Sequence, residues 1–405
     1  MASERDLHAK EKRRPGLSRT GESVDYPFLL LVLLLLTVGL AMLYSASYAQ
    51  SEYDTSYEIS TKYLQKQAVC AAIGLAGNTD PWAVIRFFFA GNMPSYVMNS
   101  LKLAVCLVIT VNVVGVSIVL LLSVLVIGEE VNGARRWINL AGIQFQPSEI
   151  AKFTMILLFA RLTRLYGQDA KTFRHGVLGF GLALMGILVP LALEKHLSAI
   201  MLMGMVAVVM MFVAGTRTRW LLAGAGAAAV FVVVYISFMG YAGDRVTAWL
   251  HPELDPGDTG YQILQSLYAI GSGGLFGLGY GKSRQKYLYL PFQYNDYIFA
   301  VICEELGLVG AMAIVALFAV TILRGYWIAL NARDRFSTVL AAGLVTLIAV
   351  QTILNLCVVT NLLPSTGIAL PFFSYGGTAL AVNLGEMGIV LGISRGRNRR
   401  KIQEA

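Results

Sequence analysis

The chain has 405 residues, of which 56% are hydrophobic and only 14% are charged, with a net charge of +8. Soluble domains carry about 25% charged residues, so this composition excludes a soluble multidomain protein and a disordered chain. It also argues against a nucleic-acid binder, despite the positive charge. A polytopic membrane protein is the class that remains.

Ten apolar segments follow one another along the chain, and most are long enough to span a membrane, which takes about 20 helical residues. They cover residues 27–47, 63–77, 101–127, 148–166, 175–193, 197–214, 219–240, 297–323, 337–358 and 379–394. The second segment is short, and residues 78–100 are an interfacial segment or a broken helix. The predicted fold is an all-α membrane protein, a bundle of about ten transmembrane helices.

The basic residues indicate one orientation of this bundle. With the N-terminus in the cytoplasm, most of the 32 Lys and Arg residues lie on the cytoplasmic side, as the positive-inside rule requires. The chain then divides into a basic tail over 1–26, a transmembrane domain over 27–394 and a second basic tail over 395–405. A large extracellular loop is expected at 241–296.

The first polar cluster covers residues 128–152. Arg135 and Arg136, beside Trp137, suit a phosphate or diphosphate head group, because guanidinium groups bind oxyanions bidentately; the alternative is an interfacial anchor. Glu149 and Lys152 are three residues apart and share one helix face. Ionisable groups within a membrane helix mark either a functional site or an internal ion pair.

The second cluster covers residues 244–307, and its most informative residue is Asp296, where a polar loop meets an apolar helix. A carboxylate there would reach a lipid-linked head group at the outer membrane boundary. The alternative is helix capping, with Asn295 as N-cap and Asp296 in the first turn. The other acidic candidates are Asp244, Asp255, Asp258, Glu304 and Glu305. The glycine-rich stretch Gly271–Gly281 lacks the spacing of a nucleotide-binding loop.

The third cluster covers residues 361–388. Pro364, Pro371 and the pair Gly376-Gly377 are incompatible with a straight spanning helix. Irregular backbone at membrane depth is tolerated only where protein buries it or where it lines a cavity. We therefore expect a re-entrant segment that borders an outward-facing cavity.

Together these stretches resemble the SEDS family of cell-wall polymerases, which includes FtsW, RodA and SpoVE. The residues that carry the resemblance are NGARRWINLAGIQFQPSEIAKF (132–153), DPGDTGYQILQSLYAIGSGGLFGLGYGKSRQKYLYLP (255–291), NDYIFAVICEELGLVG (295–310) and LPSTGIALPFFSYGGTAL (363–380). The sequence looks closer to FtsW and SpoVE than to RodA.

The resemblance implies a peptidoglycan glycosyltransferase that joins lipid II into glycan strands at the outer face of the bacterial cytoplasmic membrane. The implied partners are a class B penicillin-binding protein and other membrane proteins of division or sporulation. The family's essential aspartate falls on Asp296, which would act as general base on the 4-hydroxyl of the acceptor sugar.

The resemblance and the polar clusters together predict a set of substrate-binding residues. They are Arg135, Arg136, Trp137, Glu149, Lys152, Arg245, Gln262, Gln265, Ser266, Lys282, Gln285, Ser374 and Tyr375. Of these, the four cations Arg135, Arg136, Lys152 and Arg245 would neutralise the diphosphate. A divalent cation, Mg²⁺ or Mn²⁺, is compatible with that chemistry, although no multi-carboxylate cage points to one.

The sequence departs from the family at three places. Pro291-Phe292 stands where the family has a Pro-Glu pair, Lys195–Ala199 replaces a PDLGTA-like turn, and residues 76–115 match least. Two other functions therefore stay open. A lipid II flippase would use the ten spans, Glu149 with Lys152, and the broken 361–378 region. A non-catalytic scaffold would explain the missing glutamate.

Overall fold

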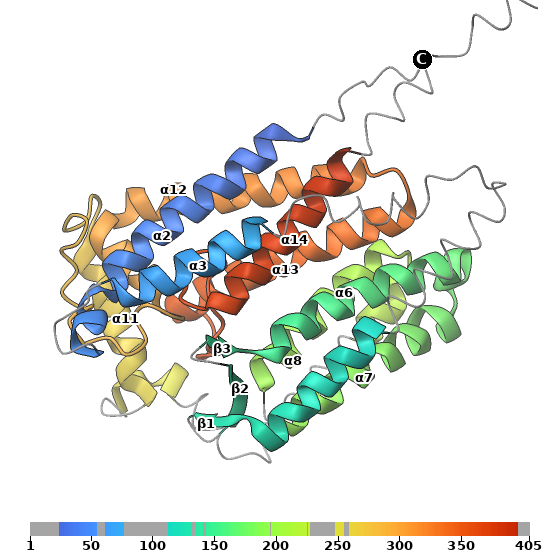
Figure 1. Cartoon of the computed structure of the whole chain (residues 1–405), viewed down its shortest axis with the longest axis horizontal. Coiled ribbons are helices and arrows are strands. Elements are labelled where there is room, and N and C mark those ends of the chain that lie inside the picture. The colour runs from blue at the N-terminus through green and yellow to red at the C-terminus, as the bar shows by residue number, and fades with distance from the viewer. Residues whose placement is uncertain are drawn as a thin grey trace, which may run out of the picture.

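The computed structural model describes residues 24–54, 61–76, 112–131, 134–140, 143–194, 196–224, 226, 248–254 and 259–395. Long helices run roughly parallel to one another through this part of the chain (Figure 1), in agreement with the predicted bundle. The named helices are α2 (Tyr26–Asp54), α3 (Lys62–Ala76), α6 (Pro147–Tyr166), α7 (Phe180–Leu193), α8 (Leu197–Val213), α11 (Thr259–Gly273), α12 (Ile298–Leu330), α13 (Arg335–Val359) and α14 (Gly377–Arg395).

The described helices agree closely with the predicted spans. Five are long and apolar enough to cross a membrane: Tyr26–Ser51, Arg174–Leu193, Ile298–Leu330, Arg335–Val359 and Gly377–Arg395. Shorter apolar helices cover Asn112–Ile127 and Leu197–Val213. Each remaining predicted segment also coincides with a helix, except 219–240, which lies mostly outside the described residues. The uncertain stretch 78–100 lies wholly outside them. At 15 residues, α3 is too short to cross the hydrocarbon core.

The central helix of the bundle is α13. It packs against α12, α6, α8 and α14, and 78% of its most apolar window is buried inside the protein. An apolar helix that is buried nearly all round forms the core. Its few polar side chains, among them Gln351 and Asn355, therefore face other helices and not lipid.

A small antiparallel sheet interrupts the otherwise helical fold. It consists of β1 (Glu129–Val131), β2 (Ala134–Leu140) and β3 (Ile143–Phe145) in the order β1-β2-β3. The all-helical prediction did not anticipate it, because strands this short carry little periodic signal. Consecutive residues of a strand point to opposite faces, so Arg135 and Arg136 on β2 do not point the same way.

The long helix α12 is broken at Gly307. Its 33 residues would extend about 50 Å, well beyond the bilayer core. The backbone at Gly307 has φ 68° and ψ −172°, and the amide of Leu308 donates to the carbonyl of Gly274 at 2.9 Å. A Cβ on Gly307 would lie 2.3 Å from the amide nitrogen of Gly277. Only glycine therefore lets the loop pack this closely against the helix.

Irregular backbone joins α13 to α14, as the prolines and glycines of this segment predict. The chain is non-helical between the end of α13 and Gly377. Leu370, Phe372 and Phe373 are at most 2% exposed. The segment is thus buried in protein, which is one of the two conditions under which irregular backbone is stable at membrane depth.

Candidate functional site

Asp296 lies in the last turn of the loop that leads into α12, and it is half-buried. The helix begins at Ile298, and its N-cap is Tyr297, which makes no side-chain capping hydrogen bond. The prediction of Asn295 as the N-cap is therefore wrong.

Asn355 of α13 fixes the backbone of Asp296. Its amide nitrogen donates to the carbonyl oxygen of Asp296 at 2.7 Å and to that of Ile368 at 2.8 Å. The side chain of Asp296 lies over Gly367, where a Cβ would be 3.5 Å from its Oδ2. One buried amide thus holds the aspartate against the irregular segment before α14.

Ser374 makes the second connection between these two segments. Its hydroxyl donates to the carbonyl of Asn295 at 2.6 Å and accepts from the amide of Leu370 at 2.7 Å. The amide of Tyr375 donates to the carbonyl of Tyr294 at 2.8 Å. The predicted substrate residue Ser374 therefore uses its only hydroxyl hydrogen to position the loop of Asp296.

Helix α3 also contacts the segment that holds Asp296. The amide of Gln67, which is fully buried, donates to the carbonyl of Ser374 and accepts from the amide of Gly376, both at 3.2 Å. The ring of Tyr375 packs against Tyr63 with centroids 4.7 Å apart. These contacts connect the site to the short second helix.

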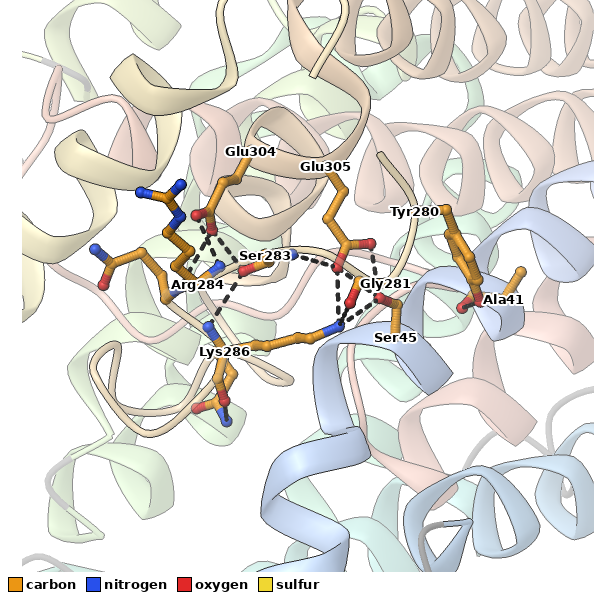
Figure 2. A network of polar contacts seen from close by, with 11 residues as sticks. Ala41, Ser45, Tyr280, Gly281, Ser283, Arg284, Lys286, Glu304 and Glu305 are labelled. Carbon is orange, nitrogen blue, oxygen red and sulfur yellow. Dashed lines mark hydrogen bonds and ion pairs between the residues drawn. The ribbon is translucent and has the colours of Figure 1, made fainter. Parts of the chain in front are cut away.

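A buried charged network fixes an earlier part of the same loop, at residues 281–286 (Figure 2). We name it the anchor cluster; it comprises Ser45, Ser283, Lys286, Glu304 and Glu305. Lys286 Nζ lies 3.2 Å from Glu305 Oε1, and the hydroxyl of Ser45 on α2 donates to the same carboxylate at 2.6–2.7 Å.

The second glutamate of the anchor cluster binds the loop backbone. Glu304 accepts from the hydroxyl of Ser283 and from the amides of Arg284 at 2.9 Å and Gln285 at 3.4 Å. Every carboxylate oxygen in the anchor cluster therefore has a donor. Such pairing is the condition for burying charge at acceptable cost, and it holds the loop to the first turns of α12.

A different group of charged and titratable side chains, most of them buried, lies around the start of α6. We name it the cation cluster; it comprises Arg136, Glu149, Lys152, Glu194, His196 and Glu386. Pro147 begins α6, which places Glu149 and Lys152 one turn apart, and their side chains form an ion pair of 2.7 Å. The predicted pair thus exists and is buried.

The turn between α7 and α8 adds two titratable groups to the cation cluster. Burial raises the pKa of Glu194 to about 7, although the positive charge of Arg136 partly opposes the rise. Burial lowers the pKa of His196 to about 3, and the positive charges of Arg136 and Lys152 add to this. His196 is therefore neutral at physiological pH, whereas Glu194 titrates near neutrality.

Several polar atoms of the cation cluster have no hydrogen-bond partner among the described residues. They are Oε1 of Glu194, Nδ1 of His196 and both carboxylate oxygens of Glu386. Buried polar atoms are rarely left unpaired, and such groups call for a water, an ion or a ligand. The cluster has the character of a binding site.

The cation cluster and Asp296 meet at one short segment. Ser198, two residues after His196, donates its hydroxyl to the carbonyl of Thr366. Thr366 precedes Gly367, on which Asp296 rests. The start of α8, just after His196, and the half-buried carboxylate of Asp296 therefore both lie against the backbone of Thr366 and Gly367.

The other predicted binding residues lie in several separate parts of the structure. Arg135 is exposed and donates to the carbonyl of Leu125 at 3.4 Å, so it is separated from Arg136 by the strand. Ser266 donates to Val359 at 2.9 Å, and Gln262 donates to Pro291 at 3.2 Å. Both therefore attach α11 to its neighbours.

The remaining candidates divide by exposure. Trp137, Gln265 and Gln285 are half-buried, and Lys282 is exposed. Arg245 lies outside the described residues. Within the residues that the structure describes, no three His, Cys, Asp or Glu side chains gather as a metal site.

Sequence reasoning did not single out Asn355, Gln67, Glu194 or Glu386. The first two are ordinary polar residues of helices, and nothing local distinguishes them. Glu386 carried a usable signal, because it is a lone carboxylate within an apolar segment, and such residues are costly in a membrane.

The chain matches a known protein family and is similar to several named proteins. The family model described as "Cell cycle protein", named for FtsW, RodA and SpoVE, matches residues 26–399. Stage V sporulation protein E of Bacillus subtilis is 37% identical, covering 92% of this chain and 97% of that protein. The probable peptidoglycan glycosyltransferase FtsW of Geobacter sulfurreducens is also 37% identical, covering 92% and 95%.

Two solved structures resemble the fold. One, titled "Structural coordination of polymerization and crosslinking by a peptidoglycan synthase complex", contains a chain that matches with a TM-score of 0.73 and 27% identity, covering 93% of this chain and 98% of that one. The crystal structure of the Thermus thermophilus rod shape determining protein RodA matches with a TM-score of 0.63 and 26% identity, with the same coverage.

Proposed function

Because the chain belongs to the FtsW/RodA/SpoVE family, we propose that it is a peptidoglycan glycosyltransferase that polymerises lipid II. Relatives carrying the name peptidoglycan glycosyltransferase align over more than nine-tenths of the chain. The observation that carries the proposal is the position of Asp296, which Asn355 and Ser374 hold beside the segment that borders the cation cluster.

The reaction requires two kinds of group. The 4-hydroxyl of the acceptor sugar attacks the anomeric carbon of the donor, and the bond from that carbon to the lipid diphosphate breaks. Asp296 takes the hydroxyl proton as general base. The leaving diphosphate keeps the bonding electron pair, and its negative charge is stabilised by fixed cations. We assign this role to Lys152, which is buried, and to Arg136, which is half-buried.

The hydrogen bonds to the backbone of Asn295 and Asp296 also support a role for this loop in positioning the general base. A base must lie within hydrogen-bond reach of the proton it accepts, and misplacement by about 1 Å can cost about 100-fold in rate. The carbonyls of Asn295 and Asp296 are both hydrogen-bonded to buried side chains. The anchor cluster fixes the preceding part of the same loop. The aspartate is therefore preorganised.

The proposal includes the location and a partner. The chain would lie in the bacterial cytoplasmic membrane with both termini in the cytoplasm and residues 241–296 outside. A class B penicillin-binding protein would cross-link the strands that it makes. The likeness to a chain of a synthase complex in which polymerisation and crosslinking are coordinated supports a partner of this kind.

The test is polymer formation by the full-length protein with its transpeptidase partner and lipid II. Asp296→Asn keeps the size of the side chain and removes the base, so polymer should fall by at least about 100-fold. Asp169→Asn, the same change at an exposed site, is the matched control and should behave as wild type. Undiminished polymer from Asp296→Asn removes the aspartate as base.

A lipid transport assay separates the other functions. In vesicles with fluorescent lipid II, the proposed enzyme should give no transbilayer movement beyond that of empty vesicles. Movement without polymer would favour a flippase instead. Absence of both activities in the reconstituted complex would favour a scaffold.

A further inference from the structure

One face of α3 packs against the start of α14 and the residues before it. Tyr63, Gln67 and Cys70 follow one another at helical spacing, so they share one side of α3. Gln67 bonds the backbone on both sides of Tyr375, and a Cβ on Gly377 would lie 2.6 Å from the sulfur of Cys70. The same face therefore directs Tyr63 toward the segment that holds Asp296.

Tyr63 packs against two other tyrosines. Its ring centroid is 4.6 Å from that of Tyr294, with the planes tilted by 37°, and 4.7 Å from that of Tyr375, with the planes at 89°. The rings of Tyr294 and Tyr375 are 6.0 Å apart. Aromatic pairs at such separations attract one another beyond the effect of burial. We name the three residues the tyrosine cluster.

The hydroxyl of Tyr63 fixes the orientation of its ring. It donates to Oδ2 of Asp54, the last residue of α2, and Oδ1 of Asp54 accepts from Gln50 at 2.8 Å. A tyrosine hydroxyl has a single hydrogen to donate, so this bond defines where it points. The hydroxyl oxygens of Tyr63 and Tyr294 lie 3.5 Å apart. The end of α2 thus holds Tyr63 within the tyrosine cluster.

Tyr294 carries this constraint toward the proposed base. It precedes Asp296 by two residues, so their Cα atoms are at most about 7 Å apart. The hydrogen bonds from Ser374 and Asn355 hold the backbone from Asn295 onward. The tyrosine cluster holds the residue just before that point.

We propose that Tyr63 is a positioning residue that holds Asp296 in place for proton transfer by packing against Tyr294. This inference rests on the proposed function, in which Asp296 is the general base. Proton transfer is sensitive to small shifts of the base, and about 1 Å can cost about 100-fold in rate. The short helix α3 thereby contributes to the reaction from outside the group of residues assigned to the substrate.

Two substitutions separate the ring of Tyr63 from its hydroxyl. With lipid II and the transpeptidase partner, Tyr63→Leu should lower kcat by about tenfold and leave KM within about twofold, because the loop before Asp296 loosens. Tyr63→Phe keeps both ring contacts and should restore kcat to within about threefold of wild type. A raised KM with unchanged kcat would place Tyr63 on the substrate and overturn the proposal, as would a wild-type kcat in Tyr63→Leu.

Tyr326→Leu is the matched control. Tyr326 of α12 is likewise half-buried, and its hydroxyl lies 2.8 Å from that of Thr346 on α13. This variant loses a comparable ring and hydrogen bond and should keep the wild-type kcat. Equal losses of kcat in Tyr326→Leu and Tyr63→Leu would indicate a general effect of packing and contradict the proposal.

A double-mutant cycle with Tyr294→Leu asks whether the effect passes through Tyr294. In the Tyr294→Leu background, Tyr63→Leu should lower kcat by no more than about twofold, because the contact is already lost. Additive losses from the two substitutions would overturn the proposal.

Hydrogen exchange tests the inference without any activity. In purified full-length Tyr63→Leu, the amide hydrogens of residues 293–297 should exchange at least about tenfold faster than in wild type. Those of residues 283–286, which the anchor cluster holds, should not change. Unchanged exchange at residues 293–297 would contradict the role of Tyr63. If Tyr63→Leu does not fold, Tyr63→Met, whose longer chain adapts to irregular gaps, replaces it in every measurement.

The proposed function fails on a different result. Polymer formation that survives Asp296→Asn would contradict the general base, and the exchange rates would still decide whether Tyr63 holds the loop. A wild-type kcat and wild-type exchange in Tyr63→Leu, in a protein that needs Asp296, would contradict the inference about Tyr63 alone.

Discussion

The anchor cluster and the cation cluster are both buried groups of charges, yet they are paired very differently. In the anchor cluster, each oxygen of Glu304 and Glu305 accepts a hydrogen bond. In the cation cluster, Glu194 Oε1, His196 Nδ1 and both oxygens of Glu386 have no hydrogen-bond partner within the part of the chain that the structure describes. A fully paired network stabilises one structure, whereas an incompletely paired one carries a cost in stability that a ligand can offset.

The largest effect is expected from breaking the anchor cluster. Glu305→Ala leaves the buried ammonium of Lys286 without its carboxylate, and such a loss costs about 3–5 kcal/mol. Thermal unfolding of the purified protein in nanodiscs measures it. The double variant Glu305→Leu with Lys286→Met removes both charges and should recover most of the stability. A single variant as stable as wild type would contradict the importance of this ion pair.

Removing the carboxylate of Glu194 from the cation cluster should increase the stability of the protein at high pH, the opposite of the effect in the anchor cluster. The pKa of Glu194 is raised from 4.5 to about 7, so folding favours the protonated acid. Its contribution is complete below pH 4.5 and is lost as the pH rises through about 7, a change of at most about 3 kcal/mol. Unfolding midpoints between pH 4.5 and 8 should therefore fall in wild type.

The variant Glu194→Gln should flatten this pH dependence and be the more stable protein at pH 8. Glu253→Gln provides the control, because the side chain of Glu253 is 66% exposed and its removal should leave the wild-type slope. If Glu194→Gln retains the wild-type slope, or is destabilising at pH 8, then burial of the ionised Glu194 does not cost stability, and the proposed difference between the two clusters does not hold for this residue.

A smaller effect is expected at Ser374, which joins the loop of Asp296 to the irregular segment before α14. Ser374→Ala removes a hydroxyl that joins Asn295 to Leu370, and two lost hydrogen bonds cost about 1–3 kcal/mol. Because the loop of Asp296 loosens, kcat for polymerisation should fall more than KM changes. Ser337→Ala is a suitable control, since that serine bonds Asp334 at 2.7 Å near the start of α13. Equal kcat for both variants would argue against a positioning role.

Much of the functional site was accessible from sequence, and the reasons differ by residue. Asp296 stood out because ionisable groups are scarce in this chain, and the family resemblance pointed to the same position. The pair of Glu149 and Lys152 followed from helical spacing. By contrast, Arg135 and Arg136 looked like one clamp, and the short strand β2 separates them. The roles of Asn355 and Gln67 depend on partners far away in the chain.

The sequence by itself determined the class, the approximate spans, the irregular segment before α14 and the family, because each depends on local composition or on contiguous motifs. Only the tertiary structure decided which buried charges are paired. Ser45 meets Glu305, and Ser374 meets Asn295, across long stretches of chain, whereas both oxygens of the buried Glu386 lack a hydrogen-bond partner among the described residues. Pairing depends on distances between helices, and these are set by packing of the whole bundle.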